Sequence, residues 1–112
     1  MKYDLNEIRV KEGEQVSITL RHTGKLTKDA MGHNFVLLAS GVSLADFAAK
    51  AIQAKATDYI PEGTNEVIAH TKLIGGGESD TIEFTAPAKG TYEFLCSFPG
   101  HSALMKGTFI VE

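Results

Sequence analysis

The sequence predicts an all-β fold, a sandwich or barrel of about seven short strands with one α-helix inserted between them. Three observations indicate this class: short apolar stretches with a period of two, turn residues between these stretches, and a single segment with helical spacing. The chain has 112 residues, of which 43% are hydrophobic and 22% charged, as in ordinary globular proteins. We expect one domain over residues 1–112.

A polar turn separates the first two predicted strands. The apolar residues Leu5, Ile8 and Val10 lead into this turn at residues 11–14 (KEGE). Over residues 16–21 (VSITLR) apolar side chains alternate with polar ones, which predicts a strand with one buried face. His22 continues the apolar positions of this strand, so we expect its ring to point inward.

The middle of the chain contains the predicted helix. A polar loop over residues 23–29 precedes a mostly apolar strand over residues 33–38. In residues 43–55 (SLADFAAKAIQAK) the apolar residues recur at helical spacing, and Ser43 can cap the N-terminus. We expect this amphipathic helix to cover part of the β-structure.

Strand patterns return after the turn residues Pro61 and Gly63. The last four strands are expected around residues 67–70, 81–85, 91–96 and 107–111. Tyr92, Phe94 and Cys96 share one face of their strand, because alternate residues of a strand point the same way. The Cys96 thiol is therefore expected on the core side.

Composition excludes several classes of function. Eleven Lys and Arg against fourteen Asp and Glu give a net charge of −3, which argues against a nucleic-acid partner. No apolar stretch approaches the ~20 residues that span a bilayer, so we expect no membrane span in this chain. The N-terminus has no apolar signal core; if the protein is exported, its targeting segment has been removed. A single cysteine excludes an internal disulfide.

The loop at residues 96–105 (CSFPGHSALM) carries the most specific chemistry. It contains Cys96, His101 and Met105 in the spacing C-x4-H-x3-M, with a proline and a glycine that allow the chain to turn back. One thiolate, two imidazoles and a weak axial thioether are the ligands of a type-1 (blue) copper site. A second imidazole must come from elsewhere, and His33 is the candidate, at the start of a predicted strand.

Three stretches of the sequence are similar to those of the azurins, which are bacterial cupredoxins. They are residues 31–34 (MGHN), 67–75 (VIAHTKLIG) and 98–108 (FPGHSALMKGT), and the likeness extends over nearly the whole chain. The resemblance implies a Greek-key β-sandwich with one type-1 copper near one end. Two departures are clear. The single cysteine excludes the disulfide usual in azurins, and Phe35 replaces their usual tryptophan.

The resemblance also implies roles for individual residues. The implied copper ligands are His33, Cys96 and His101 in the equatorial plane, Met105 at an axial position, and the Gly32 carbonyl oxygen as a weak contact. Asn34 and the backbone amide of Phe98 are expected to form hydrogen bonds around the Cys96 sulfur. An apolar docking patch is expected around the edge of His101, formed by Leu26, Ala30, Met31, Phe98, Pro99, Ala103 and Leu104.

The implied function is one-electron transfer by copper cycling between Cu(I) and Cu(II). The expected partners are redox proteins, such as a c-type cytochrome or a terminal reductase or oxidase, that bind transiently. Because nothing is converted chemically, we do not expect an enzyme. The resemblance places the protein in the periplasm or at the cell exterior, either free or membrane-tethered in its full-length form.

Three alternatives remain open at this level. A periplasmic copper carrier or buffer would use similar ligands. The chain could also be a copper domain cut from a larger redox protein. Zinc binds imidazole and thiolate as well, although structural zinc sites normally have four Cys or His ligands and only three such groups are expected to converge here.

Overall fold

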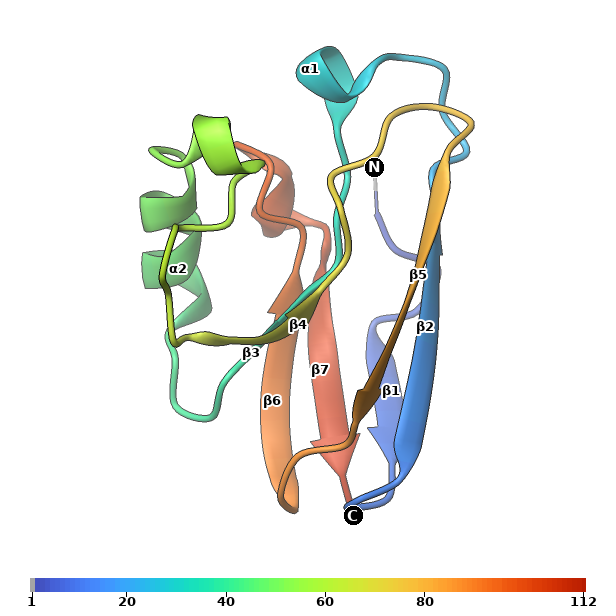
Figure 1. Cartoon of the computed structure of the whole chain (residues 1–112), viewed down its shortest axis with the longest axis vertical. Helices are drawn as coiled ribbons and strands as arrows, with labels where there is room; N and C mark the ends of the chain where they lie inside the picture. Colours follow the sequence, from blue (N-terminus) through green and yellow to red (C-terminus); the bar gives the residue numbers. More distant parts are fainter. Residues whose placement is uncertain (1) are drawn as a thin grey trace.

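The computed structural model describes residues 2–112, which form seven strands in two sheets (Figure 1). The strands are β1 (Glu7–Val10), β2 (Gln15–Arg21), β3 (Val36–Leu38), β4 (Val67–His70), β5 (Ser79–Thr85), β6 (Gly90–Leu95) and β7 (Lys106–Val111). The helices are α1 (Lys28–Met31), α2 (Leu44–Ala51) and the 3₁₀ turns η1 (Lys55–Thr57) and η2 (His101–Ala103). The predicted mostly β class with one substantial helix is confirmed.

The two sheets pack face to face. One has five strands in the order β1-β7-β6-β3-β4, and the other pairs β2 with β5. The β1–β7 pair is parallel and the remaining pairs are antiparallel. The chain crosses between the sheets after β1, β2, β4 and β5, as in Greek-key sandwiches.

The interior between the sheets is formed by the alternating apolar residues that the sequence predicted. In the β2–β5 pair, Val16 lies opposite Phe84 and Ile18 opposite Ile82, while the intervening positions are polar. The buried residues of this core are Val16, Phe35, Leu37, Ala86, Tyr92, Phe94, Phe109 and Val111. The removal of this apolar surface from water is the main driving force that holds the sheets together.

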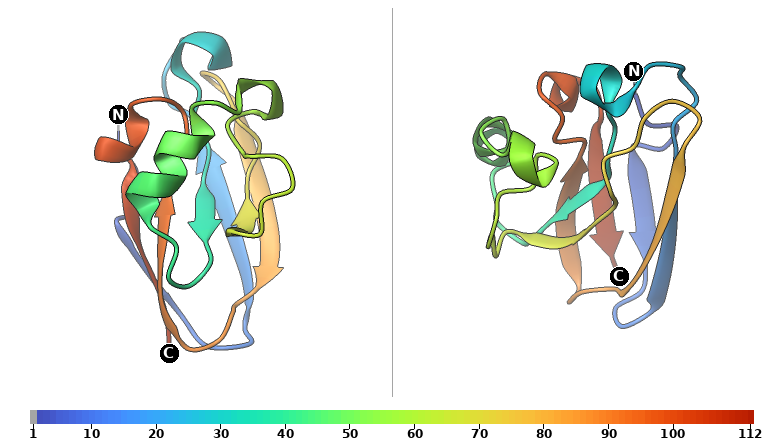
Figure 2. Two further views of the ribbon diagram at one scale, coloured as in Figure 1. Left: turned by 90° about the vertical axis from the view of Figure 1, so that its left-hand side faces the viewer. Right: turned by 45° about the horizontal axis from the view of Figure 1, so that its top comes forward.

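Helix α2 covers the outer face of the larger sheet (Figure 2). The Ser43 hydroxyl accepts a hydrogen bond from the Asp46 amide at 3.2 Å, as its N-cap position predicted. The helix buries Phe47 and Ala51 in a second apolar cluster with Val36, Leu38, Tyr59, Leu73 and Leu95. Because this cluster covers the outer face, the third strand is buried on both sides, in agreement with its mostly apolar sequence.

Three boundaries differ from the sequence-based expectation. Helix α2 ends at Ala51 rather than at residue 55, because the next amides, of Gln53 and Ala54, bond to carbonyls only three residues back. The polar loop expected over residues 23–29 ends early, at the start of α1. The strand expected over 33–38 pairs regularly only within β3, while His33 forms an isolated bridge with Ile74. No helix within residues 2–112 combines the length and apolar character needed to cross a membrane.

Candidate metal centre

The four donor side chains of the predicted site come from connections at one end of the sandwich, where α1 and η2 also lie (Figure 1). His33 follows α1, separated from it by Gly32. Cys96 directly follows β6, His101 begins η2, and Met105 directly precedes β7. The loop from 96 to 105 is closed by backbone hydrogen bonds, because the Cys96 amide donates to the Met105 carbonyl at 2.9 Å.

Three of these side chains converge on one point. The ligand atoms of His33, Cys96 and His101 all lie within 4.8 Å of one another. The Cys96 sulfur lies 3.7 Å from His101 Nδ1 and 3.9 Å from the Gly32 carbonyl oxygen. Cys96, His101 and Met105 are buried, with exposed fractions of 0%, 4% and 2%, whereas His33 is half-buried.

Gly32 lets the chain reach this point. A Cβ added at Gly32 would lie 2.6 Å from the Lys28 carbonyl oxygen and 2.9 Å from Leu73 Cγ. Both distances are shorter than van der Waals contact, so a larger residue would displace the backbone that leads to His33. The glycine thus allows α1 and the segment after β4 to pack closely beside the backbone that leads to His33.

His33 Nδ1 has no hydrogen-bond partner in the described part of the chain, although the atom is buried. A buried unpaired polar nitrogen costs about 1–3 kcal/mol, so such an atom calls for an explanation. A metal ion held with Cys96 and His101 would supply the missing partner. One soft thiolate and two imidazoles suit copper, so the residues present fit this metal.

The protonation of the donors also suits metal binding. Burial, reinforced by the neighbouring His22 and His101, lowers the pKa of His33 to about 4. Burial also lowers the pKa of His101. Both imidazoles therefore favour their neutral form, which has a free lone pair. Burial raises the pKa of the Cys96 thiol, against the effect of the Asn34 and Phe98 backbone amides, so metal binding must displace a proton.

We expect the metal-free protein to lose stability as the pH falls from about 6.5 toward 4. In the unfolded chain His33 takes up a proton near its ordinary pKa of 6.5, whereas in the folded chain its pKa is about 4. The unfolded state therefore binds more protons in this range, and its free energy falls relative to the folded state. The measurement is the thermal unfolding midpoint of the metal-free protein between pH 7.5 and pH 4.

Substitution of His33 separates its contribution to the pH dependence from that of the rest of the chain. His33→Gln should reduce the pH dependence, with His101 accounting for part of what remains, whereas His70→Gln, at an exposed position, should keep the wild-type profile. An identical pH profile for wild type and His33→Gln would contradict the assignment.

A buried pair of polar side chains fixes the two halves of the site to each other. Asn34 Nδ2 donates to the Ser97 hydroxyl at 2.9 Å, and the Ser97 amide donates to Asn34 Oδ1 at 2.8 Å. Asn34 and the backbone amide of Phe98 were expected to form hydrogen bonds around the Cys96 sulfur. The backbone amides of both residues act on the Cys96 thiol, whereas the Asn34 side chain joins the segment after His33 to the segment after Cys96. The sequence did not identify Ser97, because a lone serine carries no distinctive signal.

His22 supports His33 directly. Its ring is buried, as the strand alternation predicted, and stacks on the His33 ring with centroids 4.2 Å apart and an interplanar angle of 22°. The Gly24 amide donates to His22 Nδ1 at 3.0 Å, so Nε2 carries the proton and donates to the Met31 carbonyl at 2.6 Å. The His22 ring is thus held in one tautomer and one orientation beside His33.

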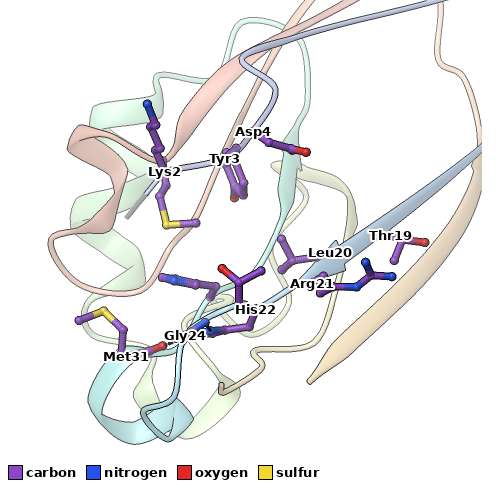
Figure 3. Close-up of a pocket in the computed structure, with 12 residues that line it drawn as sticks. Lys2, Tyr3, Asp4, Thr19, Leu20, Arg21, His22, Gly24 and Met31 are labelled. Atoms are coloured by element: carbon purple, nitrogen blue, oxygen red, sulfur yellow. Dashed lines mark hydrogen bonds between the residues drawn. The ribbon is translucent and has the colours of Figure 1, made fainter. Parts of the chain in front are cut away.

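A cavity of about 670 Å³ adjoins this side of the site, lined by residues 2–4 and 19–24 together with Met31, His33 and Met105. Figure 3 shows His22, Gly24 and Met31 grouped along one part of its wall, with Lys2 and Tyr3 across from them. Tyr3 is anchored by a 2.5 Å hydrogen bond from its hydroxyl to the Asn34 carbonyl. The N-terminal segment therefore lies against the residues that surround the site.

The residues of the expected docking patch differ in exposure. Leu26 and Leu104 are 55% and 66% exposed, which is unusual for large apolar side chains. Ala30 and Ala103 are also exposed, whereas Met31, Phe98 and Pro99 are half-buried. These residues belong to the connections around α1 and η2, at the same end of the molecule as the site (Figure 1).

A β-sandwich with a buried thiol and two imidazoles converging at one end, and a methionine nearby in the same loop, defines the class of blue copper electron-transfer proteins. Comparison with known proteins gives the same class. A profile described as copper binding proteins, plastocyanin/azurin family, matches residues 1–112. The chain therefore belongs to the plastocyanin/azurin family and takes one type-1 copper as its cofactor.

Individual relatives are similar over most of their length. Azurin-2 from Alcaligenes xylosoxydans xylosoxydans is 46% identical over 112 residues, covering 96% of this chain and 87% of the relative. The structure of reduced auracyanin from Roseiflexus castenholzii has a TM-score of 0.89 at 39% identity, covering 99% of this chain and 87% of that one. Auracyanin A from Chloroflexus aurantiacus, described as a "blue" copper protein, has a TM-score of 0.87 at 33% identity. The match covers 97% of this chain and 87% of auracyanin A.

Proposed function

We propose that residues 1–112 act as a single copper domain in which His33, Cys96 and His101 hold the metal, with Met105 as a weak axial ligand and the Gly32 carbonyl as a distant contact. The observation that carries this assignment is the convergence of the three donors within 4.8 Å around an otherwise unpartnered His33 Nδ1. The burial of Met105 in the same loop supports its place beside them.

Copper, when bound, supplies the one-electron Cu(I)/Cu(II) couple. The residues of this chain keep the donors in nearly one arrangement for both oxidation states. The Asn34–Ser97 hydrogen bonds fix the segments that bear His33 and Cys96, and the stacked His22 ring limits rotation of His33. A site that is held in this way needs little rearrangement when an electron arrives or leaves. Nothing in this process converts a substrate, so we infer a carrier rather than an enzyme.

We propose that electrons pass through the edge of His101 within the apolar patch of Leu26, Ala30, Met31, Pro99, Ala103 and Leu104. An exposed apolar patch suits brief contact with a partner through a small interface. Redox partners follow from the family in general; the specific proposal is a c-type cytochrome or a terminal reductase or oxidase. The proposed location is the periplasm or cell exterior, with or without a membrane tether in the full-length protein.

The test is titration of the metal-free protein with Cu(II), followed by ascorbate, with the visible absorption spectrum as readout. We expect an intense blue band that saturates at one equivalent and bleaches reversibly on reduction. Weak colour, or irreversible loss of the thiol, would contradict the proposal and favour a copper carrier or a zinc site. Slow loss of copper to a competing chelator would further separate an electron carrier from a protein that delivers the metal.

Met105→Leu should retain the blue colour and raise the reduction potential. The thioether is proposed as a weak ligand that donates some charge, so its removal leaves the thiolate and imidazoles in place and favours Cu(I). The measurement is voltammetry together with the visible spectrum. Leu104→Ala is the control, because Leu104 is 66% exposed one position away and its side chain is not a metal donor. A variant that binds copper without colour would count against the ligand assignment.

A further inference from the structure

The backbone is strained at two consecutive residues beside the site. Asp58 and Tyr59 have φ angles of 55° and 65°, in the left-handed region that glycine normally occupies. A bulky aromatic residue is a genuine outlier in this region. Such strain persists only where the surroundings enforce it, and it is concentrated near functional sites. In this conformation the Tyr59 carbonyl meets the Ser97 hydroxyl and the Tyr59 ring meets Phe98, two residues of the loop that bears Cys96 and His101.

The Tyr59 carbonyl is linked to the segment that bears the thiol. It accepts a hydrogen bond from the Ser97 hydroxyl at 2.7 Å. The same hydroxyl accepts from Asn34 Nδ2 at 2.9 Å, so Ser97 is held from both sides. Ser97 is 2% exposed, which shields these bonds from competition with water. The strained turn is therefore connected to the residue after Cys96 and to the residue after His33.

The Tyr59 ring is linked to the other half of the site. It meets the Phe98 ring edge-on, with centroids 5.3 Å apart and an interplanar angle of 67°. Phe98 in turn lies against His101, with centroids 4.5 Å apart. Tyr59 is 8% exposed and packs in the apolar cluster beneath α2, so its ring has little freedom. A rigid Tyr59 therefore limits the positions open to Phe98, and Phe98 limits those open to His101.

We propose that Tyr59 is a positioning residue of the copper site, acting on His101 through Phe98 and on Cys96 through Ser97. This inference rests on the proposed ligand assignment. It gives a role to the left-handed backbone, because both links depend on the direction in which the strained turn presents Tyr59. The flat ring is the essential part of the link to His101.

The test compares four variants with the wild type in the copper-loaded protein. Tyr59→Gly removes the ring and relieves the backbone strain; Tyr59→Phe keeps the ring. Asp58→Gly is the matched control, because it relieves strain at the neighbouring exposed residue while leaving Tyr59 in place. Tyr59→Leu keeps an apolar side chain but has no flat ring, and it replaces Tyr59→Gly in the comparison if Tyr59→Gly fails to fold. Three readouts use the copper-loaded protein: the blue absorption band, the reduction potential and the competition for copper with a chelator. The fourth readout is the NMR spectrum of the metal-free protein, in which the signals of the His101 ring are followed.

We expect Tyr59→Phe and Asp58→Gly to match the wild type in all four readouts. Tyr59→Gly and Tyr59→Leu should bind copper about tenfold less tightly, as is typical when residues supporting a ligand are lost. Their blue band should shift and their His101 signals broaden.

A folded Tyr59→Gly or Tyr59→Leu protein with the wild-type band and affinity would overturn the inference, as would Tyr59→Phe behaving like Tyr59→Gly. A wild type that forms no blue site would instead refute the proposed function on which the inference rests.

Discussion

Cys96→Ser is expected to abolish the blue absorption band completely. The intense colour of a type-1 site requires a copper-bound thiolate, and Cys96 is the single cysteine of the sequence. A serine hydroxyl is a hard and weakly acidic donor, so Cu(I) in particular should be held poorly. Because Cys96 is fully buried, no other thiol or solvent-exposed group can take its place. The measurement is the visible spectrum during Cu(II) titration of the purified variant.

The control for this experiment removes a possible metal donor elsewhere. His70 is exposed on β4, outside the cluster of converging donors, and His70→Gln should keep the full band at one equivalent of copper. Retention of an intense blue band by Cys96→Ser would contradict the ligand assignment. Loss of the band in both variants would point to a defect in folding or loading, which circular dichroism of the metal-free proteins would reveal.

Phe47→Ala should lower the free energy of unfolding by about 3–5 kcal/mol. The Phe47 side chain is fully buried beneath α2, in the cluster that attaches the helix to the larger sheet. Its truncation loses the transfer free energy of the ring and leaves a cavity that the surrounding residues cannot fill completely. Because a domain of this size has a total stability of about 5–15 kcal/mol, this is a large fraction. Chemical denaturation of the metal-free protein measures the effect.

Ile52→Ala gives the matched control at the C-terminal end of the same helix. Ile52 follows α2 directly but is 49% exposed, so its truncation should change stability by less than about 0.5 kcal/mol. Equal effects of the two substitutions would contradict the role of α2 as a packed cover over the sheet.

The alternation of apolar and polar residues was sufficient to predict most of the fold. In β2 the pattern VSITLR placed Val16 and Ile18 in the interior and His22 inward, and the structure confirms all three. The prediction succeeds because the side chains of a strand point alternately to its two faces. A strand with one buried face therefore has apolar residues at every second position of its sequence. Helix α2 was predicted for the equivalent reason, although its C-terminus was expected at residue 55 and lies at Ala51, since helix ends depend on local hydrogen bonding.

The donors that are close in sequence were also predictable. Cys96 and His101 lie in one short loop whose proline and glycine turn the chain back, so their proximity is a local property. His33 is a different case. Its choice over His22 and His70 depended on the resemblance to azurins, because neither spacing nor composition links it to a loop more than sixty residues away.

Tertiary structure alone brings His33 to the site. The β3–β6 pair aligns Val36 with Leu95, and this antiparallel register carries Asn34 to Ser97 and His33 to the level of the metal loop. The stacking of His22 on His33 and the contact of Tyr59 with Phe98 likewise join residues far apart in the chain. The sequence by itself thus determined the strands, the main helix and the local part of the donor set. Sheet register and packing decided the rest, because the distances between remote residues depend on how whole elements pair and not on the residues between them.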